Sequence, residues 1–117
     1  GIKTTPFILI LADTKSTSSA EITEIKWGAL YPGSYTTYTL YLYNDHPQQS
    51  VSLHLSTYDW SPLIAANFIA VTWDCENYKL LPKTSLCVTF TLTASENTTD
   101  ITNYSFQILI TGISVDT

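Results

Sequence analysis

The chain is poor in charged residues and contains no arginine. Charged residues make up 13% of the sequence, about half the usual share of roughly 25%. The formal net charge is −5 and the pI is near 4.6. No basic stripe is present that would hold a phosphate backbone or an anionic membrane surface. Nucleic acid is therefore not an expected partner.

Long hydrophobic runs are also absent. A membrane-spanning helix needs about 20 apolar residues, and the strongest apolar run, Pro6–Ala12, is far shorter. This run also lacks the flanks of an intact signal peptide. Because the chain begins with Gly1 instead of Met, we expect that an upstream segment has been removed. We expect no membrane span in this chain.

Residues that would support catalysis are scarce. The only histidines are His46 and His54, and no motif places a nucleophilic Ser or Cys beside either of them. The remaining candidates are carboxylates near the predicted turns, Asp45, Asp59, Asp74 and Glu76. Their spacing matches neither a calcium loop nor the acid pair of a glycoside hydrolase. We therefore expect a protein that is not an enzyme and needs no metal or cofactor.

The two cysteines, Cys75 and Cys87, have no CxxC partner and no histidine at zinc-ligand spacing. A disulfide between them would close a short loop around Pro82 and stabilise the fold by about 3 kcal/mol in the chain-entropy model. It would also indicate an oxidising compartment. Two separately buried thiols are the alternative. We expect the disulfide.

Threonine, serine and tyrosine take the place of the missing charges, with 8 Tyr and 44% hydrophobic residues overall. Hydrophobic and hydroxyl-bearing residues alternate with a period of two, which is typical of half-buried strands. The clearest segments are 35–43, 51–56, 69–73, 88–93 and 104–111. A single helical turn is possible at Leu63–Ala66. A chain of 117 residues with this pattern predicts one all-β domain, a β-sandwich of about seven strands.

The segment Pro6–Ala12 differs from every other predicted strand because it is apolar on both faces. A period of two places Phe7, Leu9 and Leu11 on one face and Ile8, Ile10 and Ala12 on the other. Such a strand needs covering from both sides. The polar stretch that follows, residues 14–20, is typical of a flexible linker. We therefore divide the chain into an N-terminal strand (1–13), a linker (14–20) and a sandwich domain (21–117).

Two N-glycosylation sequons, at Asn97 and Asn103, lie in one polar region before the last predicted strand. Two sequons together predict covalent N-glycans on an exposed loop of a secreted protein.

Several turn and strand segments resemble small secreted archaeal β-sandwich proteins. They are Trp27–Ser34, Leu53–Ser56, Val71–Asp74 and Ile101–Phe106, with Ile110-Thr111-Gly112 at the end. The resemblance covers about residues 25–112. It implies an immunoglobulin-like or jelly-roll sandwich that is extracellular. Some such proteins are subunits of pili or threads that join by strand donation. An antibody-type topology is not expected, because Cys75 and Cys87 are too close in sequence.

These observations lead to one main hypothesis and two alternatives. The main hypothesis is a structural subunit of an extracellular filament, in which the N-terminal strand (Phe7, Ile8, Leu9, Ile10 and Leu11) is donated to an identical neighbour. In the first alternative this strand folds back into its own sandwich. The second is a monomeric cell-surface module that binds glycan or protein through Trp60. Trp73 has the parity of a core residue, whereas Tyr41 and Tyr43 are candidates for a subunit contact.

Overall fold

The computed structural model describes residues 1–4, 8–11, 25, 27–28, 30–96 and 103–116, and these residues form an all-β fold. The strands in the described residues are β1 (Ile2–Thr4), β2 (Ile8–Leu11), β3 (Tyr35–Asn44), β4 (Ser50–Ser61), β5 (Ile69–Trp73), β6 (Lys79–Leu80), β7 (Ser85–Ala94) and β8 (Ser105–Val115). A short 3₁₀-helix, η1 (Leu63–Asn67), lies where the sequence predicts a single helical turn. The all-β prediction is confirmed, although this part of the chain alone holds 8 strands instead of about seven.

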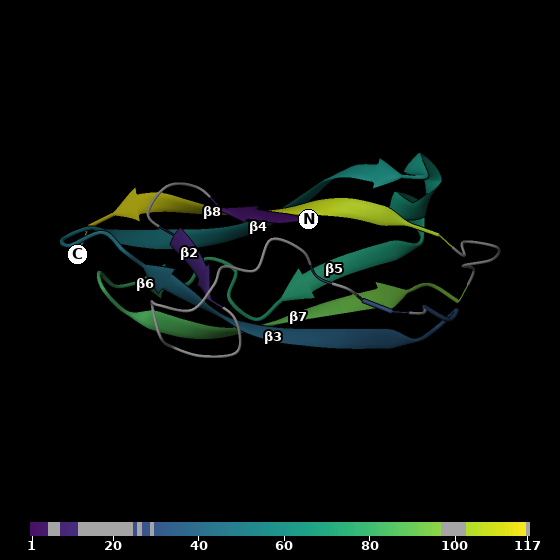
Figure 1. The fold of residues 1–117 in the computed structure, drawn as a ribbon, viewed down its shortest axis with the longest axis horizontal. Helices are drawn as coiled ribbons and strands as arrows, with labels where there is room; N and C mark the ends of the chain where they lie inside the picture. The colour runs from purple at the N-terminus through teal and green to yellow at the C-terminus, as the bar shows by residue number, and fades with distance from the viewer. Residues whose placement is uncertain (5–7, 12–24, 26, 29, 97–102, 117) are drawn as a thin grey trace.

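Two four-stranded sheets form the two layers of the molecule (Figure 1). One sheet has the order β1-β8-β4-β6, and the other has the order β2-β3-β7-β5. Neighbouring strands are antiparallel except β1 and β8, which are parallel. The sheets face each other across a shared hydrophobic core, as expected for a β-sandwich.

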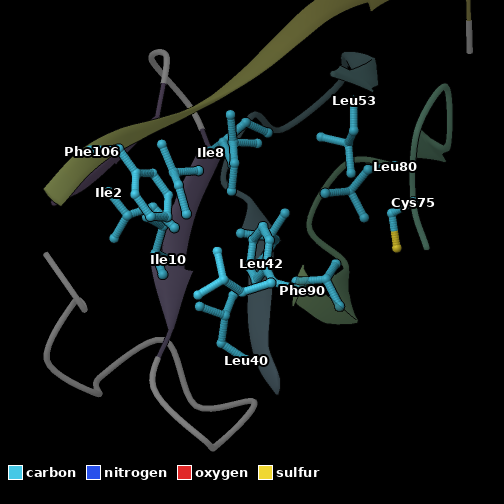
Figure 2. Close-up of a cluster of buried hydrophobic side chains, with 14 of the residues drawn as sticks. Ile2, Ile8, Ile10, Leu40, Leu42, Leu53, Cys75, Leu80, Phe90 and Phe106 are labelled. Atoms are coloured by element: carbon cyan, nitrogen blue, oxygen red, sulfur yellow. The ribbon is translucent and has the colours of Figure 1, made fainter. Parts of the chain in front are cut away.

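Strict alternation in β3 and β7 builds the centre of this core. Leu40 and Leu42 on β3, and Val88 and Phe90 on β7, are 0% exposed. The residues between them are mainly threonine and tyrosine and lie on the outer face. Figure 2 shows Leu40, Leu42 and Phe90 in one cluster with Leu53 and Leu80 from the other sheet. A period of two therefore predicts correctly which face of each strand is buried.

Strand β4 is longer than the alternation predicts, because it continues beyond Ser56 to Ser61. It pairs with β8 from Ser50 to Tyr58, and the register then shifts before Ser61. Asp59 has a φ of 54° at this irregularity, a conformation that Asp tolerates better than most residues. Trp60 thus lies within β4, beyond the end of the predicted strand 51–56.

Asn44, at the end of β3, is fully buried and joins two turns. Its Nδ2 donates to the carbonyls of Gln49 (2.8 Å) and Leu80 (3.1 Å), and its Oδ1 accepts from the backbone N–H of His46 (3.0 Å). All of its side-chain polar atoms therefore have partners, as a buried amide requires. Asn44 is also the register partner of Ile8, so this network fixes the end of β3 against which β2 pairs.

Candidate assembly site at the N-terminal strands

The N-terminal residues contribute one edge strand to each sheet. β1 runs parallel to β8, with Ile2 opposite Ile108, and the backbone N–H of Ile108 donates to the Gly1 carbonyl (2.9 Å). β2 runs antiparallel to β3, with Ile8 opposite Asn44. Only residues 5–7 separate β1 from β2, so the two strands lie on the same side of the sandwich (Figure 1). There the Thr4 hydroxyl donates to the Ile8 carbonyl (2.6 Å).

Three isoleucine side chains from this segment enter the core between the sheets. Ile2, Ile8 and Ile10 are 4%, 1% and 3% exposed, and Figure 2 shows them beside Phe106 and Leu42. Burial of an isoleucine side chain contributes about 1.5–3 kcal/mol. The N-terminal segment is therefore a substantial part of the core of this chain.

The two faces of β2 are not equally covered. Ile8 and Ile10 point inward, whereas Leu9 points outward and is only half-buried. The expectation that both faces are sealed is thus corrected for Leu9. Phe7, Ala12 and the side chain of Leu11 lie outside what the structure describes, as do residues 12–24, which include the expected linker.

Gly112 on β8 makes room for this segment. A Cβ at Gly112 would lie 3.2 Å from Cγ1 of Ile8 and 3.2 Å from Cβ of Val51, which is tighter than ordinary side-chain contact. Sequence reasoning did not assign Gly112 to the site. The available signal was a glycine inside a strand, which often marks a close approach by another part of the protein.

In the isolated chain, β2 pairs with its own β3, so the fold-back alternative describes this state. The chain's own β1 and β2 therefore fill the space between β8 and β3.

The cysteines do not form the expected disulfide, because both are free thiols. Cys75 is buried in the core cluster, whereas Cys87 is exposed on the outer face. The alternation of β7 explains this difference, since Val88 and Phe90 point inward and Cys87 must point outward. Burial, reinforced by a hydrogen bond to Asp74 (3.1 Å) and the charge of Asp74, raises the pKa of Cys75 to about 12.

The carboxylate of Glu76 binds the protein itself. It accepts hydrogen bonds from the backbone N–H of Leu55 (2.9 Å) and from Nε1 of Trp73 (2.9 Å), and it lies 3.1 Å from Nδ1 of His54. The Leu55 N–H is the largest cause that lowers the pKa of Glu76, and the Trp73 and His54 contacts act in the same direction. Glu76 therefore holds the β5–β6 connection against β4.

Three further candidates, His46, Asp45 and Asp74, also have protein partners. Nδ1 of His46 accepts from the backbone N–H groups of Gln48 (3.1 Å) and Gln49 (2.9 Å). Asp45 pairs with Lys83 (3.1 Å), and Asp74 accepts from the backbone N–H of Thr89 (3.1 Å). The described residues contain no group of three or more His, Cys, Asp or Glu that could hold a metal ion.

The tryptophans pack onto core aromatics. Trp60 stacks on Phe106 with ring centroids 4.4 Å apart, and Trp73 stacks on Phe90 at 5.7 Å. Trp73 is partly buried against the core, in agreement with its predicted parity. Trp60 also presents one ring face to Phe106, so that face is not free to stack on a sugar.

Asn103 is exposed and lies just before β8. Asn97 lies outside the described residues. Among the helical residues that the structure describes, none belongs to a helix long and apolar enough to cross a membrane.

No protein-family model matches this chain, and the searches of curated proteins and of solved structures return no match either.

Proposed function

We propose that this chain is a structural subunit of an extracellular filament that assembles by N-terminal donor-strand complementation. One observation carries the proposal: residues 1–4 and 8–11 supply an edge strand to both sheets and three buried side chains to the core. Edge strands are the elements of a sheet that exchange most readily, because only one of their sides is hydrogen-bonded.

Exchange between copies would preserve every contact seen in the isolated chain. Ile2, Ile8 and Ile10 of one copy would fill the groove between β8 and β3 of the next. The donating copy would then have an empty groove of its own, ready for a further neighbour. Such a head-to-tail contact does not close on itself, so it extends into a fibre.

The proposal includes an extracellular location and N-glycans at Asn97 and Asn103. These parts rest on the two sequons and on the resemblance to secreted archaeal sandwich proteins. The two-sheet architecture is also compatible with the immunoglobulin-like or jelly-roll class that the resemblance implies. Identical subunits are the proposed partners.

A complementation experiment with two variants tests the proposal. Ile10→Asp places a charge in the groove and disables the donor strand, whereas Gly112→Val fills the space that Ile8 needs and disables the groove. We expect wild-type protein at high concentration to form filaments in negative-stain micrographs and neither variant alone to do so. A mixture of the two should form 1:1 heterodimers, measurable by native mass spectrometry, because one variant keeps a donor and the other keeps a groove.

Lys3→Thr is the matched control, because Lys3 is exposed on β1 and points away from the core. This variant should form filaments as the wild type does. Strand donation is refuted if the wild type stays monomeric at every concentration and the mixed variants do not associate.

A further inference from the structure

We propose that β1 and β2 form a single N-terminal strap that opens and closes as one unit while the rest of the sandwich stays folded. The strap consists of Ile2–Thr4 and Ile8–Leu11, which are edge strands of different sheets. Its opening uncovers β8 in one sheet and β3 in the other at the same time. Such a unit exists within each single chain, whether or not copies exchange strands.

A hydrogen bond and a short connection join the two strands of the strap. The Thr4 hydroxyl donates to the Ile8 carbonyl (2.6 Å), and only residues 5–7 separate the strands. β1 and β2 also contact each other directly. Departure of β1 would therefore take away the donor that satisfies the Ile8 carbonyl, and this loss disfavours a state in which β2 alone is docked.

The hydrophobic core joins the two strands a second time. Ile2, Ile8 and Ile10 are all buried and lie in one cluster with Phe106 (Figure 2). Ile8 belongs to the sheet that contains β3, yet its Cγ1 lies so close to Gly112 of β8 that an added Cβ there would be 3.2 Å away. Removal of either strand would leave a cavity beside the buried side chains of the other, and a cavity costs free energy in proportion to its size. One strand docked without the other is therefore an unfavourable state.

The rest of the sandwich keeps its own pairing when the strap is open. β3 pairs with β7 from Tyr35 to Tyr43, and β4 pairs with β8 from Ser50 to Tyr58. The side chain of Asn44, the residue at which the β2–β3 pairing ends, is hydrogen-bonded to residues outside the strap. Chain ends and elements with few neighbours open at a lower free energy than the centre of a domain. The strap can therefore open as a local unit.

Coupled opening would also regulate the strand donation proposed above, although the strap does not depend on it. A donated segment would have to supply one strand to β8 and another to β3. Only the fraction of chains with an open strap could accept it, so the apparent affinity for a donor would fall in proportion to that fraction. Substitutions that loosen the strap would then make a chain a better acceptor.

Native-state hydrogen exchange of the full chain, at a concentration where it is monomeric, tests this inference. The backbone N–H of Ile108, which donates to the Gly1 carbonyl (2.9 Å), reports on β1. The amides of residues 8–11 that pair with β3 report on β2. We expect both reporters to open with the same free energy, and at a lower free energy than the amides that join β3 to β7.

Substitutions in either strand should affect both reporters. Ile2→Ala and Ile10→Ala each remove buried core contacts, so each should accelerate exchange at both reporters by at least about tenfold. Thr4→Val removes the hydrogen bond to the Ile8 carbonyl and should accelerate both by about fivefold. The control is Val71→Ala in β5, at the opposite edge of the sheet. It lowers the free energy of global unfolding, but the contacts of Val71 persist when the strap is open, so neither reporter should change.

An effect of Ile2→Ala that is confined to the Ile108 amide would overturn the inference, because the two strands would then open separately. Acceleration of both reporters by Val71→Ala would also overturn it, because the strap would then open only with the whole domain. The micrographs and the mixed-variant experiment test strand donation separately. A chain that stays monomeric can still have a strap, and filaments can form from a chain whose two strands open one at a time.

Discussion

Three polar side chains take over hydrogen bonds where the backbone ladders end. Asn44 donates to the Leu80 carbonyl, Asp74 accepts from the Thr89 N–H, and Glu76 accepts from the Leu55 N–H. Asn44 links β3 to β6 of the other sheet, whereas Asp74 and Glu76 bind the connection between β5 and β6 to β7 and β4. These side chains bond to backbone groups that would otherwise need water. They therefore stabilise the regions where the strands end.

Glu76 makes stability depend on pH in the acidic range. Its pKa in the folded protein lies below the ordinary value of 4.5, so folding favours the ionised form. The resulting stabilisation is present above the pKa of the unfolded chain and is lost as pH falls through the lowered folded pKa. We expect Glu76→Gln to lower the melting temperature near neutral pH by a few degrees and to make little difference near pH 3. Thermal melts across this range, with Glu96→Gln as an exposed control, measure the effect. A constant difference at all pH values would contradict it.

The two thiols should differ sharply in reactivity. Cys87 is exposed, whereas Cys75 is buried and its pKa is raised to about 12, so Cys75 has almost no thiolate at neutral pH. Alkylation of native protein should modify one cysteine, and alkylation in denaturant should modify both. In Cys87→Ser, native protein should remain unmodified. If denatured, unreduced wild type shows no reactive thiol, the two cysteines are disulfide-bonded after all.

Among the secondary-structure elements, β2 contributes two of the three core isoleucines of the N-terminal segment, Ile8 and Ile10. Ile10 is 3% exposed, whereas its neighbour Leu9 is half-buried on the opposite face. We expect Ile10→Asp to reduce the free energy of unfolding by more than about 4 kcal/mol, because it buries an unpaired charge. Leu9→Asp should cost less than half as much. Denaturant titration of both variants is the measurement, and equal losses would mean that both faces of β2 are sealed.

Alternation predicted the long strands but not the short ones. β3 and β7 follow the period of two along their whole length, so their core positions could be assigned from sequence. β1 and β6 have 3 and 2 residues, too few to show a period, and pairing with β8 and β4 defines them. The same parity in β7 already places Cys87 outward, so the sequence held the information that argues against the disulfide. The role of Gly112 could not be read without knowing that Ile8 lies against it.

The whole molecule is elongated, with extents of 48 × 26 × 20 Å. The C-terminus lies at one end of the long axis, whereas the N-terminus lies near its middle, on β8 (Figure 1). A strand donated from this position would connect neighbouring bodies along their sides, not only at their tips.

The pairing of the first strand with the last has a consequence for the order of events during synthesis. The amino group of Gly1 donates to the carbonyl of Phe106 (3.3 Å), across 105 positions of sequence. β1, which includes Ile2, is synthesised before β8 and therefore has no docking site in its own chain until β8 has been made. If the segment is donated as proposed, a neighbouring copy with an empty groove would compete for it until it has docked. Under the proposed strand donation, the choice between monomer and polymer would be a kinetic competition between docking of β1 on its own β8 and capture by a neighbour.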